Sequence, residues 1–189
     1  MEITTYLLNR IGFLRNDLLK SRKSNIGFPD FLGIGAQKAG TTWLYENLRK
    51  HPELFLPEKK EIHFFDRQFY KSINWYYKHF LDADILKTKG EITPSYSILS
   101  DEKIKFIYKM NPKLRIILLL RNPAERAWSH AVMNLVKRTK RNISLVKNEE
   151  FIAHFKHTRS IERGDYLKII RNWEKYFSPD QIFIGDYSQ

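Results

Sequence analysis

The segment Phe31–Leu44 constrains the fold more than any other part of the sequence. Its residues, FLGIGAQKAGTTWL, predict a short apolar strand, a turn of small residues with one lysine, and a helix that begins near two threonines. The first turn of a helix carries unpaired backbone N–H groups and the positive end of the helix dipole, so it binds anions. Gly35 and Gly40 allow the backbone to approach a ligand closely. The segment therefore predicts a phosphate-binding turn between a strand and a helix.

Lys38 adds a full positive charge to this turn, and Thr41 and Thr42 add hydroxyl donors. In a Walker A loop, G-x-x-x-x-G-K-[ST], the lysine follows the last glycine. Here Lys38 precedes Gly40 by two residues, so the turn suits a phosphate group but not the usual geometry of a Mg²⁺-bound triphosphate. The alternative is an ordinary strand–turn–helix junction with a surface lysine.

The composition favours an anionic partner. Among 189 residues there are 33 Lys+Arg and 21 Asp+Glu, which gives a formal charge of +12. Such a surplus suits a nucleotide, an acidic polysaccharide, nucleic acid or an anionic membrane, although a lysine-rich surface can also serve solubility alone. The absence of cysteine excludes disulfides, thiolate metal sites and cysteine nucleophiles. No apolar run is long enough for a transmembrane helix.

Residues 1–28 are expected to form a separate N-terminal segment. Apolar and basic residues alternate between Met1 and Ser24, which predicts a basic amphipathic helix. The segment has neither a continuous apolar core nor a small-residue cleavage site, so we expect no signal peptide. A packing or solvated helix is favoured over a membrane-surface anchor. We expect residues 29–189 to form one domain in a cytoplasmic protein.

The run Leu114–Leu120 predicts the fold class. It is almost continuously apolar, as in a strand buried on both faces of a parallel sheet. Alternation of strands and helices along the chain predicts a three-layer α/β domain with a central, mainly parallel sheet. Beside strands over 31–35, 89–93 and 181–185, we expect helices over 41–49, from Ser72 onward, and over 101–110, 123–138, 149–156 and 164–177.

A second anion site is predicted where the apolar run ends. Arg121 lies at the strand exit, where its guanidinium can bind a phosphate through two hydrogen bonds. Ser129 follows on the next helix, and Arg126 is expected on the same face because it is three residues away. Ligands bind at the carboxyl ends of strands in such sheets, and both anion sites lie there. The alternative is an arginine that caps the sheet and a serine on a solvated helix.

The segment Glu61–Asp66 supplies the candidate general base. Glu61 precedes an aromatic stretch, and apolar surroundings raise the pKa of a carboxylate towards the range useful for a base. His63 is the competing candidate, although a lone histidine beside two phenylalanines is more often structural. Glu91 and Thr93 form a third polar cluster, which could equally be a turn that satisfies backbone groups. The histidines match no metal-binding pattern, so we expect no metal site.

Four motifs in order resemble the sulfotransferase family that uses 3′-phosphoadenosine 5′-phosphosulfate. Gly35–Thr42 resembles its 5′-phosphosulfate loop, and Arg121–Ser129 resembles its 3′-phosphate motif. Lys60–Asp66 is similar to the catalytic segment of the heparan-sulfate-type branch, as is Gly164-x-Tyr166 with the aromatic residues after it. The resemblance extends from about Pro29 to Gly185.

The resemblance implies a P-loop NTPase-like fold and transfer of a sulfuryl group from that donor to a hydroxyl or amine, without metal. The acceptor is expected from the residues instead: the aromatic segment Phe64–Tyr77 and the lysine surplus suit a carbohydrate, whether acidic or neutral, although a lipid or a small metabolite is the alternative. We expect no nucleic-acid partner. By this resemblance Lys38 stabilises the leaving oxygen, and Glu61, or alternatively His63, deprotonates the acceptor. The residues implied for the acceptor are Glu91, Thr93 and Tyr166. Those implied for the donor are Lys38, Ala39, Gly40, Thr41, Thr42, Trp43, Arg121 and Ser129.

Three features differ from the heparan-sulfate-type pattern. Ile92 stands where a lysine commonly follows the glutamate. Trp43 instead resembles the small-molecule sulfotransferases, where a tryptophan stacks on adenine, although a core aromatic residue is the alternative. Family members usually continue past the strand matched by 181–185 into a basic loop that closes over the nucleotide, so we expect this chain to lack that part. The competing functions are a nucleotide or nucleoside kinase and a non-enzymatic binder of acidic polysaccharide or nucleic acid.

Overall fold

The computed structural model describes residues 27–187 and places the apolar run in the middle of a parallel sheet. The run forms β4 (Arg115–Leu120), whose central residues are buried. The strands lie in the order β2-β3-β1-β4-β5, and every neighbouring pair is parallel. The other strands are β1 (Phe31–Gly35), β2 (Leu54–Phe55), β3 (Thr88–Ile92) and β5 (Ile182–Asp186).

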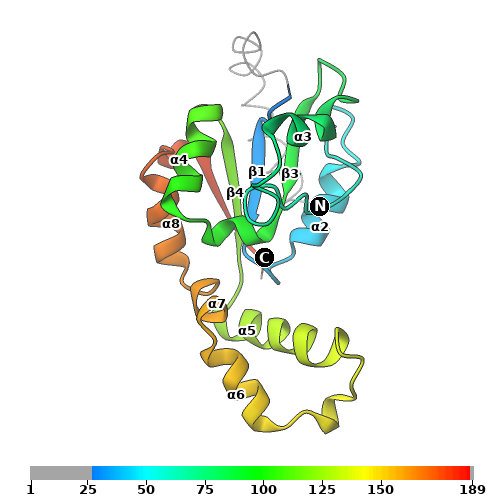
Figure 1. Cartoon of the computed structure of the whole chain (residues 1–189), viewed down its shortest axis with the longest axis vertical. Helices are drawn as coiled ribbons and strands as arrows, with labels where there is room; N and C mark the ends of the chain where they lie inside the picture. Colours follow the sequence, from blue (N-terminus) through cyan, green and yellow to red (C-terminus); the bar gives the residue numbers. More distant parts are fainter. Residues whose placement is uncertain (1–26, 188–189) are drawn as a thin grey trace.

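Helices cover both faces of this sheet, as predicted. The connections from β1 to β2 and from β3 to β4 run in opposite directions across the sheet, so right-handed crossovers place their helices on opposite faces. Helix α2 (Thr41–Leu48) belongs to the first connection and α4 (Asp101–Met110) to the second. Helix α8 (Tyr166–Glu174) packs beside α4, away from α2 (Figure 1). The three-layer α/β architecture is therefore confirmed.

Three helices leave the sheet at the carboxyl end of β4 and form a helical arm (Figure 1). They are α5 (Pro123–Val132), α6 (Asn148–Lys156) and α7 (Thr158–Glu162). The arm has a small core of its own, made by Ala131, Val146 and Phe151. The predicted helix over 123–138 is α-helical only to Val132 and continues as a π-helical turn, Met133–Lys137.

The rest of the chain packs aromatic residues against the sheet. Helix α3 (Ile73–Tyr77) begins as predicted at Ser72, whose Oγ accepts a hydrogen bond of 3.3 Å from the Trp75 amide. Tyr76 of this helix is fully buried and stacks on Phe64 with ring centroids 4.7 Å apart. Short 3-10 turns complete the structure at Lys78–Phe80, Pro94–Ile98, Ile143–Leu145 and Pro179–Gln181.

The sequence predictions differ from this structure in a few places. The helix predicted over 164–177 is shorter, and α7 precedes it unpredicted. The predicted N-terminal amphipathic helix lies outside the described residues. Among residues 27–187, no helix has the length and apolar character that a membrane span requires.

Candidate functional site

The predicted phosphate-binding turn connects β1 to α2 through backbone conformations that few residues adopt. Lys38 and Gly40 have φ angles of 72° and 78°, in the left-handed region. Gly40 is the N-cap residue of α2 and has no side chain with which to cap the helix amides. The Ala36 amide donates to the Leu119 carbonyl over 2.7 Å, which fixes the turn to β4. The turn thus presents the amino end of α2 at the same edge of the sheet where β4 ends.

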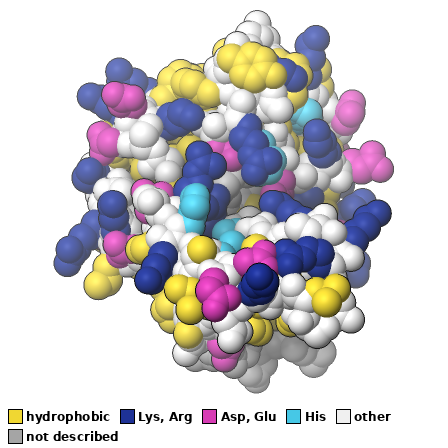
Figure 2. All heavy atoms as spheres, turned by 60° about the horizontal axis from the view of Figure 1, so that its bottom comes forward, with side chains coloured by type: hydrophobic (Ala, Val, Ile, Leu, Met, Phe, Trp, Pro, Cys, Tyr) yellow, Lys and Arg dark blue, Asp and Glu magenta, His cyan; other side chains and the backbone are white. Residues whose placement is uncertain are grey.

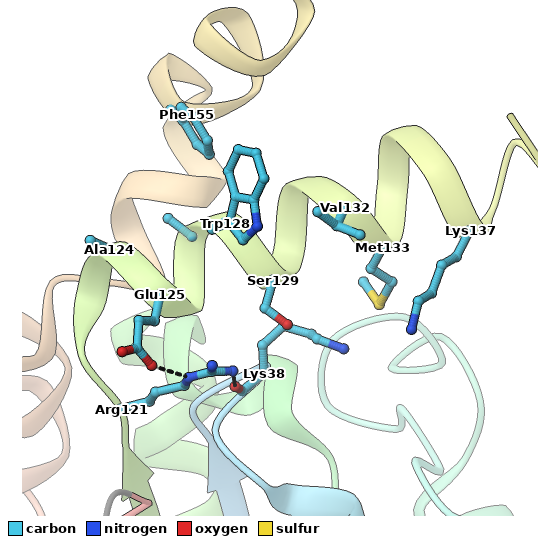
Figure 3. Close-up of a pocket in the computed structure, with 11 residues that line it drawn as sticks. Lys38, Arg121, Ala124, Glu125, Trp128, Ser129, Val132, Met133, Lys137 and Phe155 are labelled. Atoms are coloured by element: carbon cyan, nitrogen blue, oxygen red, sulfur yellow. Dashed lines mark hydrogen bonds and ion pairs between the residues drawn. The ribbon is translucent and has the colours of Figure 1, made fainter. Parts of the chain in front are cut away.

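Lys38 and Arg121 line one cavity of about 750 Å³, although 83 residues separate them (Figure 3). The Arg121 Nη1 donates a hydrogen bond of 3.2 Å to the Lys38 carbonyl oxygen. Ser129 reaches the same cavity from α5. The two predicted anion sites therefore open into a common space. Besides Glu125, the remaining lining residues are an apolar group and one further lysine: Ala124, Ala127, Trp128, Val132, Met133, Phe155 and Lys137.

Positive charge is concentrated around Lys38. Burial lowers the pKa of its amine, and Lys137 and then Arg121 lower it further through electrostatic repulsion. Lys60, the residue before Glu61, adds to this effect. Figure 2, with the lower end of Figure 1 turned forward, shows Lys and Arg side chains around a hollow on this face. These cations repel one another when the cavity holds no anion. An anion bound there would be attracted by all of them and would relieve this repulsion.

Arg121 is held by groups on three sides. Its Nε donates to a Glu125 carboxylate oxygen over 3.1 Å, and the Tyr187 ring lies 5.2 Å from its guanidinium carbon. The Tyr166 hydroxyl donates to the Arg121 carbonyl oxygen over 2.7 Å. The Asn122 side chain caps α5 by accepting from the Ala124 amide over 3.0 Å. The roles of Tyr187 and Asn122 were not predicted, although asparagine before proline is a recognisable helix-start signal.

Glu61 and His63 are brought together by an unusual backbone. Both have positive φ angles, 62° and 58°, which non-glycine residues seldom adopt. The Glu61 carboxylate accepts from Lys60 Nζ over 2.8 Å and lies 3.2 Å from His63 Nε2. The predicted rise in the pKa of Glu61 is wrong, because the hydrogen bond from His63 outweighs burial and, with Lys60, lowers that pKa to about 2.

The other side of the His63 ring is also bonded to a carboxylate. His63 Nδ1 lies 2.9 Å from an Asp66 oxygen, to which the Ser95 hydroxyl donates over 2.7 Å. The hydrogen bonds to Asp66 and then to Glu61 raise the pKa of His63 to about 9 despite its burial. At neutral pH the imidazole is therefore a cation between two carboxylates. The signal for this pairing was the i, i+3 spacing of His63 and Asp66.

Glu91 and Thr93 form a buried cluster beneath this segment. Glu91 is 2% and Thr93 0% exposed. The Glu91 carboxylate accepts hydrogen bonds from Thr93, Tyr76 and Tyr96. Burial raises the pKa of Glu91. This burial favours a supporting role over direct contact with an acceptor, and Tyr166 likewise lies against Arg121; their acceptor roles stay predictions.

Two further predictions are corrected by the structure. Arg126 does not share the cavity face of Ser129, because it is 1% exposed and its Nη2 donates to the Ser160 carbonyl oxygen over 2.9 Å. Trp43 is 49% exposed on α2, so it is not a core aromatic residue. It does not line the cavity, and neither do the remaining predicted donor residues, Ala39, Gly40, Thr41 and Thr42. Their roles stay predictions.

Metal ligation finds no support within residues 27–187, where no group of three or more His, Asp or Glu is placed to hold a metal ion. The charged groups present are those of an anion site beside a carboxylate–imidazole–carboxylate arrangement. Such an arrangement can bind an anionic ligand at Lys38 and Arg121 and offer a deprotonated carboxylate, Glu61, to a second substrate.

Known proteins resemble this chain in sequence and in fold. The family model described as "Sulfotransferase domain" matches residues 28–189. The membrane-associated sulfotransferase kil1 of Dictyostelium discoideum is 38% identical over 154 residues, covering 78% of this chain and 31% of that protein. Human heparan sulfate glucosamine 3-O-sulfotransferase 5 is 30% identical over 200 residues, covering 95% of this chain and 57% of that protein.

A solved structure, the sulfotransferase from Alicyclobacillus acidocaldarius, superposes with a TM-score of 0.70 at 26% identity, covering 85% of this chain and 74% of the other. The chain thus spans between about a third and somewhat over half of the two curated relatives. The match of the family model over most of the sequence, together with this likeness in fold, shows that the chain belongs to the sulfotransferase family.

Proposed function

We propose that the protein transfers a sulfuryl group from 3′-phosphoadenosine 5′-phosphosulfate to a hydroxyl or amine of a carbohydrate. The observation that carries this proposal is the single cavity that contains both Lys38 and Arg121. A nucleotide whose ribose carries two phosphate-type groups and a flat base suits this lining of cations and apolar side chains.

The residues present fit the donor. Lys38 would bind the 5′-phosphosulfate, since it lies in the turn before α2 and is surrounded by other cations. Arg121 and Ser129, which line the same cavity, would bind the 3′-phosphate. Trp128 offers an apolar ring on the same wall, and it is 49% exposed. The donor supplies an activated sulfuryl group, and the chain supplies the charges that bind it.

In the reaction the acceptor oxygen or nitrogen forms a bond to sulfur while the bond from sulfur to the bridging phosphate oxygen breaks. Charge develops on that leaving oxygen, and Lys38 is the cation of the turn that can stabilise it. The acceptor gives up its proton to a base, for which Glu61 is the better candidate. A base must be deprotonated at the working pH, and with pKa values of about 2 and 9, Glu61 meets this condition while His63 does not.

His63 therefore serves Glu61 rather than replacing it. Its cationic ring lies 3.2 Å from the Glu61 carboxylate on one side and 2.9 Å from Asp66 on the other. These contacts hold the carboxylate in one orientation. The same contacts lower the pKa of Glu61 and so make it a weaker base. A position close to the acceptor proton has to offset this loss of basicity.

A carbohydrate acceptor is supported by the relatives and by charge. The human relative is named for glucosamine 3-O-sulfation of heparan sulfate, and the present chain carries a formal charge of +12. Ile92, in place of the lysine common in that branch, argues for a different acceptor contact here. The predicted cytoplasmic location stays a prediction.

Equilibrium binding tests the proposal. Adenosine 3′,5′-bisphosphate without Mg²⁺ should bind at least tenfold more tightly than ATP with Mg²⁺, and the Arg121→Ala variant should lose this preference. Tighter binding of Mg²⁺–ATP would instead identify a kinase-like site. Equal, weak and strongly salt-dependent binding of both nucleotides would identify a non-enzymatic polyanion binder. Transfer to a panel of glycans from radiolabelled donor would then identify the acceptor.

A further inference from the structure

The helical arm encloses basic side chains that form no ion pair with an acidic residue of the described part of the chain, residues 27–187. Arg126 and His130 come from α5, His154 from α6, and Arg163 from the residue after α7. Arg126 is 1% exposed, and Arg163 and His130 are each 8% exposed. None of these four side chains lines the donor cavity. We call them, with Asn134, the arm cluster.

The two arginines of the arm cluster leave several donors unused. Arg126 donates from Nη2 to the Ser160 carbonyl oxygen, but its Nε and Nη1 are buried without a hydrogen-bond partner. Arg163 donates from Nη1 to the Arg159 carbonyl oxygen over 3.1 Å, while its Nε is buried without a partner. A buried cationic group with unsatisfied donors is costly unless an anion or other acceptor meets it.

The two histidines add donors of the same kind. The Asn134 side-chain amide donates to Nε2 of His130 over 3.1 Å and to Nε2 of His154 over 2.9 Å. With the Asn134 amide in this orientation, both rings carry their proton on Nδ1. Among residues 27–187, both Nδ1 atoms and the Asn134 Oδ1 are buried without a partner. The ring centroids lie only 4.7 Å apart. The two adjacent rings therefore add two N–H donors to those of the arginines.

No acid within residues 27–187 compensates the cluster. No ion pair joins a carboxylate to Arg126 or Arg163 there. Glu162 raises the pKa of Arg163, but burial, and then Arg159 and Arg126, lower it, so this pKa stays below its ordinary value. Arginines this deeply buried are normally paired with a carboxylate or another anion.

We propose that the arm cluster binds one small tetrahedral oxyanion, of the sulfate or phosphate class, between α5, α6 and α7. The unpartnered donors of Arg126, Arg163 and the two histidines come from three segments, and an oxyanion with four oxygens can accept from all of them. The bound anion joins α6 and α7 to α5, the helix that carries Ser129 into the donor cavity. The site is independent of sulfuryl transfer and would exist even if the proposed activity were wrong.

Thermal unfolding tests this site. In an Arg121→Ala background, which weakens the donor cavity, sodium sulfate should raise the unfolding temperature by about 3 °C over sodium chloride of equal ionic strength. His154→Asp should raise the unfolding temperature without sulfate and abolish the sulfate response, because its carboxylate replaces the anion. His154→Asn, a neutral control, should lower the response without raising the starting value. Arg163→Met should abolish the response.

A sulfate response that is absent, or that persists unchanged in both His154→Asp and Arg163→Met, would overturn the proposal. Selenate soaked into crystals provides a readout that needs no variant: an anomalous selenium peak among Arg126, His154 and Arg163 supports the site, and its absence there contradicts it. A sulfated disaccharide distinguishes the source of the anion. Stabilisation by sulfate alone identifies a free ion, whereas stronger stabilisation by the disaccharide identifies a sulfate group of a glycan.

Discussion

The cavity lined by Lys38 and Arg121 and the segment Glu61–Asp66 contain opposite arrangements of charge. In the cavity, burial lowers the pKa of Lys38, and the neighbouring cations Lys137 and Arg121 lower it further. In the segment, His63 lies between Glu61 and Asp66, which raise its pKa to about 9. The cavity thus has an excess of positive charge that an anionic ligand can neutralise. In the segment Glu61–Asp66, the cation and the carboxylates already neutralise one another.

This difference assigns ligand binding to the cavity and the positioning of a catalytic group to the Glu61 segment. An excess of like charge destabilises the unliganded protein, so it indicates that a ligand of opposite sign is expected there. A fully paired group gains nothing from a charged ligand but is held in a fixed orientation. We therefore expect substitutions in the cavity to change nucleotide affinity and substitutions in the Glu61 segment to change turnover.

Glu61→Gln should give the largest effect on turnover. The amide keeps the shape of the side chain but cannot accept the acceptor's proton, so we expect kcat to fall by about 10³-fold while the affinity for adenosine 3′,5′-bisphosphate changes less than twofold. Single-turnover transfer and equilibrium binding measure the two quantities. Glu58→Gln, at an exposed carboxylate three residues before Glu61, is the control. Unchanged turnover in Glu61→Gln would remove it as the base.

Lys38→Ala should affect both quantities. Loss of the cation removes an attraction for the bound nucleotide and the stabilisation of the leaving oxygen, so we expect kcat to fall by about 10²-fold and nucleotide affinity by about tenfold. Lys50→Ala, an exposed lysine just after α2, should change neither. An effect of Lys38→Ala on turnover without an effect on binding would break the distinction between the two regions.

The sequence predicted the sheet and the position of the cavity correctly, but it did not predict the pKa of Glu61. The apolar run around β4 had one interpretation, and the strand ends of β1 and β4 placed Lys38 and Arg121 at one edge by general rules of parallel sheets. The pKa of Glu61 could not be predicted, because its pairing with His63 depends on two positive φ angles in non-glycine residues.

The position of Arg126 also depends on a contact between distant segments that the sequence pattern does not predict. Helical spacing correctly relates Arg126 to its neighbours along α5, but which face of a helix meets another segment depends on where α7 packs. That short helix carries no sequence signal strong enough to predict it. Local periodicity thus predicts the elements of a fold, whereas pairing across distant segments has to be observed.

His63→Gln should lower the stability of the protein in a way that depends on pH. The pKa of His63 rises from an ordinary 6.5 to about 9 on folding, so its stabilising contribution is complete below pH 6.5 and is lost as the pH rises through 9. We expect the wild-type protein to unfold about 4 °C above the variant at pH 6 and at nearly the same temperature above pH 9.5. Thermal melts at closely spaced pH values measure this difference. A constant difference between pH 6 and pH 9.5 would contradict the ion-paired state of His63.

Tyr166→Phe should have the smallest effect, because it removes one hydrogen bond from the support of the cavity. The hydroxyl lies 2.7 Å from the Arg121 carbonyl oxygen, and a neutral hydrogen bond contributes about 1 kcal/mol, so we expect a loss of about 2 °C in unfolding temperature and of about threefold in nucleotide affinity. Tyr108→Phe is a matched control, since Tyr108 is also partly buried and packs on the rings of Tyr176 and Phe177. If Tyr166→Phe lowered transfer to the acceptor while leaving nucleotide affinity unchanged, the residue would belong to the acceptor site instead, and Arg121 would not depend on it.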